Sequence, residues 1–300
     1  MLLNNVAVIG ASGNVGTPII KALLDAGFTV TAIARLDSTS TYPAGVEVRK
    51  ANLHSLDDVA KAFLGQDAVV STIATSAVGG QDVFADAAIV AGVKRYIPSE
   101  FGINTRKLQG EVLGKMLKSK IAHVDYLIEK AKSYPSFTWT GLATGLFFDW
   151  GLNFGTFGLS LKNKSIRILD SGNELVSTSS LSYVGKAVAA ILTHEAETAN
   201  KYIEMAEFTT SQNQILTMFE EERGTKFTVT NAKTADIEKA AHSKLSSGDH
   251  SSFVDFLLVY NFRDGNGHPF RVPEETRKAL GLAEGDLKRT IKEYIRSSSI

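Results

Sequence analysis

The sequence predicts an α/β protein built on a doubly wound, Rossmann-type parallel sheet, with a smaller C-terminal α/β substrate lobe. Apolar segments with strand character alternate with helical segments through the first half of the chain, as they do in βαβ units. The run AVVSTI at 68–73 is almost continuously apolar, which is typical of a strand covered on both faces. A glycine-rich turn joins the first apolar segment to the first helical segment.

The first half divides into strands and helices in regular order. The run VAVIGASGNVGTPIIKALLDAGFTVTAIAR, residues 6–35, reads as a strand, the glycine-rich turn, an amphipathic helix and a second strand. Ser55 is a suitable N-cap for the helix that follows the third strand. Further strands are expected at 46–49, 68–73, 95–98 and 137–142, and helices at 56–64, 82–91 and 113–132.

The second half is less regular. We expect residues 1–150 to form the NADP-binding Rossmann domain and residues 151–300 to form mainly the substrate-binding lobe. Some segments of the second half are expected to return to the first sheet, since no long linker separates the halves. Strands are expected at 165–169 and 202–205, and helices at 183–193, 211–221, 235–244, 251–262 and 273–280.

Composition excludes several classes of function. The 300 residues carry 32 cationic and 32 acidic side chains, so neither a nucleic acid nor a membrane surface is indicated as a partner. The chain has no cysteine, which excludes disulfides and thiolate metal sites, and its six histidines show no metal-ligand spacing. With no secretory signal or membrane-spanning run visible, we expect a cytoplasmic monomer or homodimer that binds a small-molecule substrate.

The glycine-rich turn predicts a dinucleotide site. A glycine at its start permits a sharp turn, a glycine in its middle lets a pyrophosphate approach the backbone, and a third lets the helix pack closely on the strand. The helix N-terminus then offers free N–H groups to the phosphates. The alternative is a tight turn without a ligand. The candidate residues are Gly10, Ala11, Ser12, Gly13, Asn14, Val15 and Gly16.

Arg35 indicates which dinucleotide binds. NAD sites usually place Asp or Glu at the end of the second strand, where it holds the ribose 2′-hydroxyl. Here the strand ends in Arg35, whose guanidinium matches a 2′-phosphate, although Asp37 follows two positions later. We therefore predict NADPH as the cofactor; the alternative is a solvated arginine at a strand end.

Further candidate residues follow the other strands of the sheet. Ligands of doubly wound sheets bind beyond the carboxyl ends of the strands. An aromatic run after the strand at 137–142 could form a pocket for a planar substrate or, equally, the hinge between the two lobes. The aromatic candidates are Phe147, Phe148 and Trp150, and the further cofactor candidates are Asn52, Thr72, Ala74, Thr75, Ser99, Phe101, Thr144 and Gly145.

Two motifs together carry a resemblance to a known family. The chain has GASGNVG at 10–16 and RYIPSEFG at 95–102. With these motifs it resembles the NmrA-like and isoflavone reductase-like family of atypical short-chain dehydrogenases, which includes phenylcoumaran benzylic ether and pinoresinol reductases. The runs FTWTGLATGLFFDWGL and FTTSQNQILTMFEEERGTKFTV are most similar to fungal members. The resemblance implies an NADPH-binding Rossmann domain with a small C-terminal substrate domain, but it implies no single substrate.

The resemblance also indicates a lysine as the group that handles a proton. The Tyr-x-x-x-Lys pair of ordinary short-chain dehydrogenases is missing, since Met116 precedes Lys120 by four positions and Gly114 precedes Lys118 by four. The family's reductases share a lone lysine, and aligning KIAHVDYL with their helix places it at Lys120, with Lys118 as the alternative register. A buried lysine can exchange a proton near neutral pH because desolvation lowers its pKa. Alternatively, both are solvated cations.

Nearby residues offer less specific signals. Ser99 and Glu100 could orient the lysine or a substrate, or could simply cap a turn. His123 lies three residues after Lys120 and is the one histidine that merits a test.

Two functions follow from these observations. The first is an NADPH-dependent oxidoreductase that transfers a hydride to a small aromatic or conjugated substrate, with Lys120 as proton donor or acceptor. The alternative is an NmrA-like regulatory protein that senses NADP(H) without reductase activity.

Overall fold

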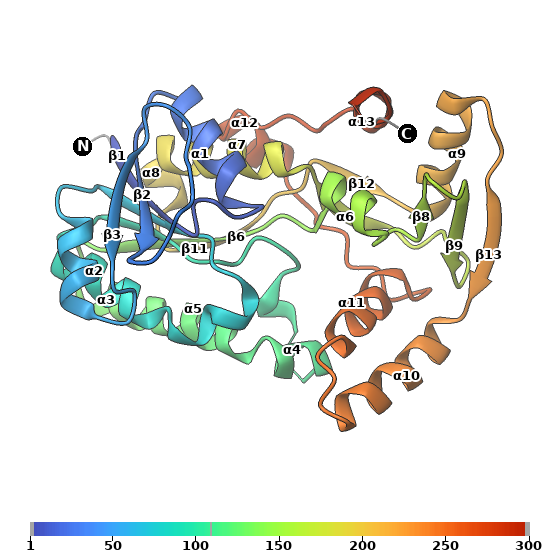
Figure 1. Cartoon of the computed structure of the whole chain (residues 1–300), viewed down its shortest axis with the longest axis horizontal. Coiled ribbons are helices and arrows are strands. Elements are labelled where there is room, and N and C mark those ends of the chain that lie inside the picture. Colours follow the sequence, from blue (N-terminus) through green and yellow to red (C-terminus); the bar gives the residue numbers. More distant parts are fainter. Residues whose placement is uncertain (1–2, 109, 298–300) are drawn as a thin grey trace.

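A seven-stranded parallel sheet forms the centre of the protein (Figure 1). The computed structural model describes residues 3–108 and 110–297. The strand order is β11-β6-β5-β4-β1-β2-β3, and the order reverses between β1 and β4, which confirms the predicted doubly wound sheet. The strands are β1 (Asn5–Ile9), β2 (Thr29–Arg35), β3 (Glu47–Ala51), β4 (Ala68–Ser71), β5 (Arg95–Ile97), β6 (Thr138–Ala143) and β11 (Lys201–Glu204).

Both faces of this sheet are covered by helices, because alternate residues of each strand point to opposite faces. In β1, Val6 and Val8 belong to one buried cluster, and Ala7 and Ile9 belong to the other. One face packs against α1 (Gly16–Asp25) and α7 (Leu181–Thr193), and the other against α2 (Leu56–Phe63), α3 (Asp82–Val90) and α5 (Lys118–Ser133).

Asp67 fixes the starts of three central strands. Its carboxylate accepts hydrogen bonds from the main-chain N–H groups of Asn4 and Asn5, both at 3.0 Å, and pairs with the Lys94 ammonium at 2.9 Å. One side chain therefore ties together the chain before β1, β4 and β5. Burial raises its pKa, but the hydrogen bonds from Asn5, Lys94 and Asn4 outweigh burial and hold this pKa below its ordinary value.

The second half both extends the sheet and builds a lobe beside it. Strand β11 pairs with β6 in parallel, and α7 packs on α1. The sequence position proposed as the domain boundary, residue 150, lies inside α6. Two three-stranded sheets form the lobe; they contain β7 (Leu146–Phe147), β10 (Val176–Ser179) and β12 (Phe208–Thr210), and β8 (Leu159–Ser160), β9 (Ser165–Leu169) and β13 (Thr228–Ala232).

Helices complete the lobe and the C-terminal region. In Figure 1, α10 and α11 lie below the lobe sheets, and α13 lies above them. Within the described residues no helix combines the length and apolar character needed to cross a membrane. The helices are α6 (Phe148–Phe154), α8 (Glu195–Thr198), α9 (Gln212–Arg223), α10 (Thr234–Ser246), α11 (Ser252–Phe262), α12 (Glu274–Ala279) and α13 (Leu287–Ser297), and the 3-10 turns are η1 (Thr75–Gly80) and η2 (Thr105–Lys107).

One predicted element is divided in the structure. The single helix expected at 113–132 is instead α4 (Val112–Met116) followed by α5, with Leu117 between them. Gly114 approaches the carbonyl oxygen of Leu108 so closely that a Cβ would lie 2.0 Å from it, and Leu117 is buried in the same apolar cluster. Tertiary packing therefore ends α4, and Lys118 and Lys120 lie in the first turn of α5.

Candidate active site

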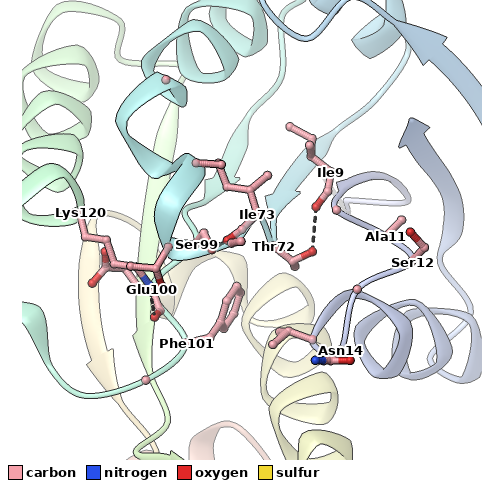
Figure 2. Close-up of a pocket in the computed structure, with 18 of the residues that line it drawn as sticks. Ile9, Ala11, Ser12, Asn14, Thr72, Ile73, Ser99, Glu100, Phe101 and Lys120 are labelled. Carbon is pink, nitrogen blue, oxygen red and sulfur yellow. Dashed lines mark hydrogen bonds between the residues drawn. The ribbon is translucent and has the colours of Figure 1, made fainter. Parts of the chain in front are cut away.

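A cavity of about 1340 Å³ opens at the carboxyl ends of the central strands and extends toward the C-terminal lobe. Seventeen of the residues predicted from sequence line it, from both the sheet and the lobe. Figure 2 shows part of its wall, with the glycine-rich turn at one side and Lys120 at the other. The seventeen are Gly10, Ala11, Ser12, Gly13, Asn14, Val15, Arg35, Asn52, Thr72, Ala74, Thr75, Ser99, Phe101, Lys120, Gly145, Phe147 and Trp150.

The backbone of the glycine-rich turn adopts a conformation that requires glycine at two positions. Gly10 has a φ of +76°, and a Cβ there would lie 2.8 Å from the carbonyl oxygen of Thr72. The Gly13 N–H donates to the Gly10 carbonyl at 2.9 Å. Gly16 does not line the cavity; a Cβ there would lie 2.3 Å from the Gly10 oxygen, so this glycine serves the close packing of helix on turn.

The start of α1 lies beside the cavity, which Val15 lines. Its N-cap, Val15, supplies no side-chain hydrogen bond, and the first turn contains no acidic residue. The Thr17 N–H donates to the Gly13 carbonyl at 3.0 Å and Pro18 has no N–H, so what this helix end offers beside the cavity is mainly its partial positive charge.

The end of β2 carries Arg35, whose side chain is 74% exposed. Its Nε lies 3.8 Å from an Asp37 carboxylate oxygen, so the guanidinium is held only loosely and can reach a ligand. The hydroxyl of Ser40 donates to that of Ser12 at 3.1 Å, which joins the loop after β2 to the glycine-rich turn. Ser38 and Ser40 line the cavity too, and the run of small polar residues after Arg35 was the available signal for them.

Two predicted hydroxyls hold the backbone of the cavity wall. The Thr72 hydroxyl donates to the Ile9 carbonyl at 2.8 Å, and the Ser99 hydroxyl donates to the Ile73 carbonyl at 2.7 Å (Figure 2). These hydroxyls therefore fix the ends of neighbouring strands. Phe101 follows, with a φ of +22° and its ring buried at the wall.

Lys120 is buried at the opposite end of this wall. It is 9% exposed, and its ammonium donates to the main-chain carbonyl of Glu100 at 3.0 Å. Burial lowers the pKa of Lys120, and the negative charge of Glu100 acts in the opposite direction. Lys118, the other candidate lysine, is exposed and does not line the cavity.

The aromatic run divides between cavity and core. Phe147 and Trp150 line the cavity, whereas Phe148 points into the lobe core, where its ring lies 5.6 Å from those of Phe157 and Phe208. Phe148 begins α6, and this change of backbone direction turns it away from the cavity. Thr144, another predicted residue, is fully buried behind the wall.

Sequence reasoning missed several apolar wall residues. Phe154 stacks on Trp150 with ring centroids 4.3 Å apart, and α11 contributes Phe253 and Leu257 from about a hundred residues further along the chain. No motif marks such a contact between distant helices, since their apolar residues read as core. Together these side chains make the lobe end of the cavity an apolar, aromatic wall.

His123 lies outside the cavity, and the described residues show no cluster of metal ligands. His123 is buried but does not line the cavity; its Nδ1 lies 2.5 Å from an Asp82 carboxylate oxygen. In residues 3–108 and 110–297, no group of three or more His, Asp or Glu side chains is arranged to hold a metal ion.

A comparison with known protein families identifies the family of this chain. The profile of the NmrA-like family matches residues 3–247. The chain therefore belongs to the NmrA-like family, and the resemblance drawn from the glycine-rich turn and PSEFG is confirmed.

Two fungal proteins and two solved structures are similar over most of the chain. Oxidoreductase aprR of Aspergillus flavus is 36% identical over 81% of this chain and 82% of its own length. Oxidoreductase poxI of Penicillium oxalicum is 30% identical over 88% and 84%. The leucoanthocyanidin reductase–NADPH complex from Vitis vinifera has a TM-score of 0.77 at 19% identity, covering 98% of this chain and 100% of that one. AtPrR2 with NADP+ and (+)pinoresinol has a TM-score of 0.78 at 18% identity, covering 98% and 99%.

Proposed function

We propose that the cavity binds NADPH along the glycine-rich turn. The support is that Gly10 and Gly13 leave the backbone of the turn uncovered at these two positions, that the start of α1 lies beside the same space, and that Arg35 lines it. Arg35 is suited to the 2′-phosphate that distinguishes NADPH from NADH. The structurally similar leucoanthocyanidin reductase was solved with NADPH, which agrees with this assignment.

We further propose that the two halves of the chain bind different ligands. Residues 1–150 supply the cofactor contacts, and residues 151–300 form mainly the substrate lobe, with β11 and α7 returned to the first sheet. The aromatic wall supports this, since it draws on α6 and α11 of the second half.

On this basis the protein is an NADPH-dependent reductase of a small aromatic or conjugated substrate. When bound, NADPH supplies the hydride. Lys120 supplies or takes the proton, and the observation that carries this role is its buried ammonium on the wall shared by the glycine-rich turn and the aromatic lobe. The stacked rings of Trp150 and Phe154 offer a flat apolar surface for a conjugated substrate. The relatives aprR and poxI are both described as oxidoreductases.

The test combines binding with turnover. Calorimetric titration of NADPH and NADH measures cofactor choice, and loss of the NADPH absorbance band reports turnover with a panel of enones, quinones and phenylpropanoid ethers. We expect tighter binding of NADPH and consumption with at least one substrate class. Tight binding without consumption across the panel would favour an NADP(H)-sensing regulatory protein. Failure to bind either nucleotide would overturn both functions.

A further inference from the structure

Glu100 is a buried acidic residue next to Lys120 at the end of the cavity. Its side chain is 2% exposed although it lines the cavity, and Figure 2 shows it beside Lys120. Burying a carboxylate is costly unless hydrogen bonds or an opposite charge compensate. An acid in this position therefore has to be stabilised by its neighbours.

Two hydroxyl groups provide this stabilisation on one side of the carboxylate. The Tyr202 hydroxyl and the Thr105 hydroxyl each donate to Glu100 Oε2 at 2.6 Å. The Thr105 N–H in turn donates to the Tyr202 oxygen at 3.3 Å. Glu100 Oε1 is also buried and has no hydrogen-bond partner among the described residues. The carboxylate is thus fixed through one oxygen, and the other remains available as an acceptor.

Tyr202 comes from β11, the strand of the second half that joins the central sheet. Tyr202 lies on β11, directly opposite Gly141 on β6. A Cβ at Gly141 would lie 2.6 Å from the tyrosine ring, so this glycine leaves the space that the ring fills. The contact joins residues 102 positions apart in the chain.

Glu100 is also the acidic group whose charge acts on Lys120. Its negative charge raises the pKa of Lys120 against the lowering effect of burial. Burial raises the pKa of Tyr202 well above its ordinary value, so its hydroxyl stays protonated and able to donate. Other titratable groups near this part of α5 include three pairs, Arg106 with Asp125 at 2.8 Å, Lys107 with Glu204 at 2.6 Å and His123 with Asp82, together with the exposed Lys118.

We propose that Glu100 and Tyr202 are positioning residues that hold the Lys120 side chain, with its proton, at the cavity wall. The main-chain carbonyl of Glu100 orients the ammonium, the carboxylate of the same residue lies nearby as the opposite charge, and Tyr202 fixes that carboxylate. The catalytic meaning of this arrangement rests on the proposed function. When Lys120 protonates a substrate oxygen, an N–H bond breaks, an O–H bond forms, and the neutral amine stays beside Glu100.

The experiment measures Lys120 directly in the cofactor-free protein. The rate of acetylation of Lys120 by acetic anhydride is followed across a pH series by peptide mass spectrometry, with exposed Lys118 on the same helix as internal reference. The labelling midpoint is the pH at which the acetylation rate of a lysine reaches half of its maximum. In Glu100→Gln we expect the midpoint of Lys120 to fall by about one pH unit, because the compensating negative charge is lost. The midpoint of Lys118 should not move.

Tyr202→Phe provides a second, milder variant. We expect a smaller fall of the Lys120 midpoint, because the carboxylate loses the Tyr202 hydroxyl that fixes its position near the ammonium, while Thr105 still donates to it. Tyr126→Phe is the matched control, since the Tyr126 hydroxyl donates to the Asp86 carboxylate at 2.7 Å on the outer side of α5. This control should leave the Lys120 midpoint unchanged.

An unchanged Lys120 midpoint in folded Glu100→Gln would overturn the proposal. If circular dichroism shows that Glu100→Gln does not fold, Tyr202→Phe decides in its place, and an unchanged midpoint there has the same consequence. The labelling needs neither cofactor nor substrate. A protein that consumes no NADPH but shows the expected shifts would therefore contradict the reductase function alone and leave the positioning of Lys120 established.

Discussion

Lys118 and Lys120 lie two residues apart in the first turn of α5 but meet opposite environments. Lys118 is exposed to solvent, whereas Lys120 is 9% exposed on the wall of the cavity and donates to the main chain of Glu100. Residues two apart on a helix face different directions, so one turn can carry both a solvated and a buried lysine.

This difference gives the first prediction. Lys120→Ala should lower turnover about 100-fold or more, as expected for loss of a general acid–base group, while NADPH affinity changes much less. Lys118→Ala is the matched control and should be nearly silent. Steady-state rates and calorimetric titration of both variants make the comparison. Loss of activity with Lys118→Ala alone would move the role two residues, and loss with neither would assign the proton to another group.

The second prediction concerns cofactor choice. Arg35→Ala should weaken NADPH binding about tenfold to a hundredfold and leave NADH binding nearly unchanged, because only the 2′-phosphate contact is lost. Asp37→Asn should change NADPH affinity in the opposite direction. Removing the carboxylate that lies 3.8 Å from the guanidinium should strengthen NADPH binding slightly. Equal NADPH and NADH affinities in the unmodified protein would contradict the role of Arg35.

Much of the fold could be predicted because its signals are local. Apolar segments and the spacing of Gly10, Gly13 and Gly16 depend on neighbours in the chain, and the predicted strand at 165–169 has the bounds of β9. Ser55 also caps α2 as expected, since its hydroxyl accepts from the Asp58 N–H.

What could not be predicted depends on tertiary contacts. The break at Leu117 follows from packing against Leu108, which no helical periodicity encodes. Phe147 and Phe148 are adjacent and chemically alike, yet one lines the cavity and the other fills the core, because the chain turns into α6 between them. The contact of Tyr202 with Glu100 depends on where β11 enters the sheet, and the sequence of β11 carries no sign of that position.

The third prediction separates two glycines of the same turn. A Cβ at Gly13 would meet the Gly10 oxygen at 3.1 Å, whereas a Cβ at Gly16 would meet it at 2.3 Å. Gly13→Ala should therefore keep the fold with a small loss of thermal stability but weaken NADPH binding, because the methyl group occupies the approach of the pyrophosphate. Gly16→Ala should lower thermal stability markedly. Circular dichroism melting and NADPH titration test both; unchanged NADPH affinity in Gly13→Ala would mean that the turn binds no phosphate.

The fourth prediction concerns the acid stability conferred by Asp67. Its pKa lies below the ordinary value in the folded protein, so the unfolded chain binds more protons around pH 3–4. The contribution of Asp67 to the free energy of unfolding is therefore present above about pH 4 and is lost as the pH falls through the folded pKa. Asp67→Asn should cost about 1–2 kcal/mol at pH 7, where the charged hydrogen bonds count fully, with the lower end favoured because Lys94 is partly exposed.

Urea unfolding at pH 7 and again near pH 3 tests this dependence on Asp67. The stabilisation decreases as the pH falls toward the lowered pKa of Asp67, so the difference between the original protein and the asparagine variant should be smaller near pH 3 than at pH 7. Asp25→Asn is the control, because Asp25 pairs with Lys21 at 2.6 Å on the exposed face of α1, and such pairs contribute little at either pH. A stability difference for Asp67→Asn that is the same at both pH values would show that its effect comes from packing at the start of β1 and not from the carboxylate charge.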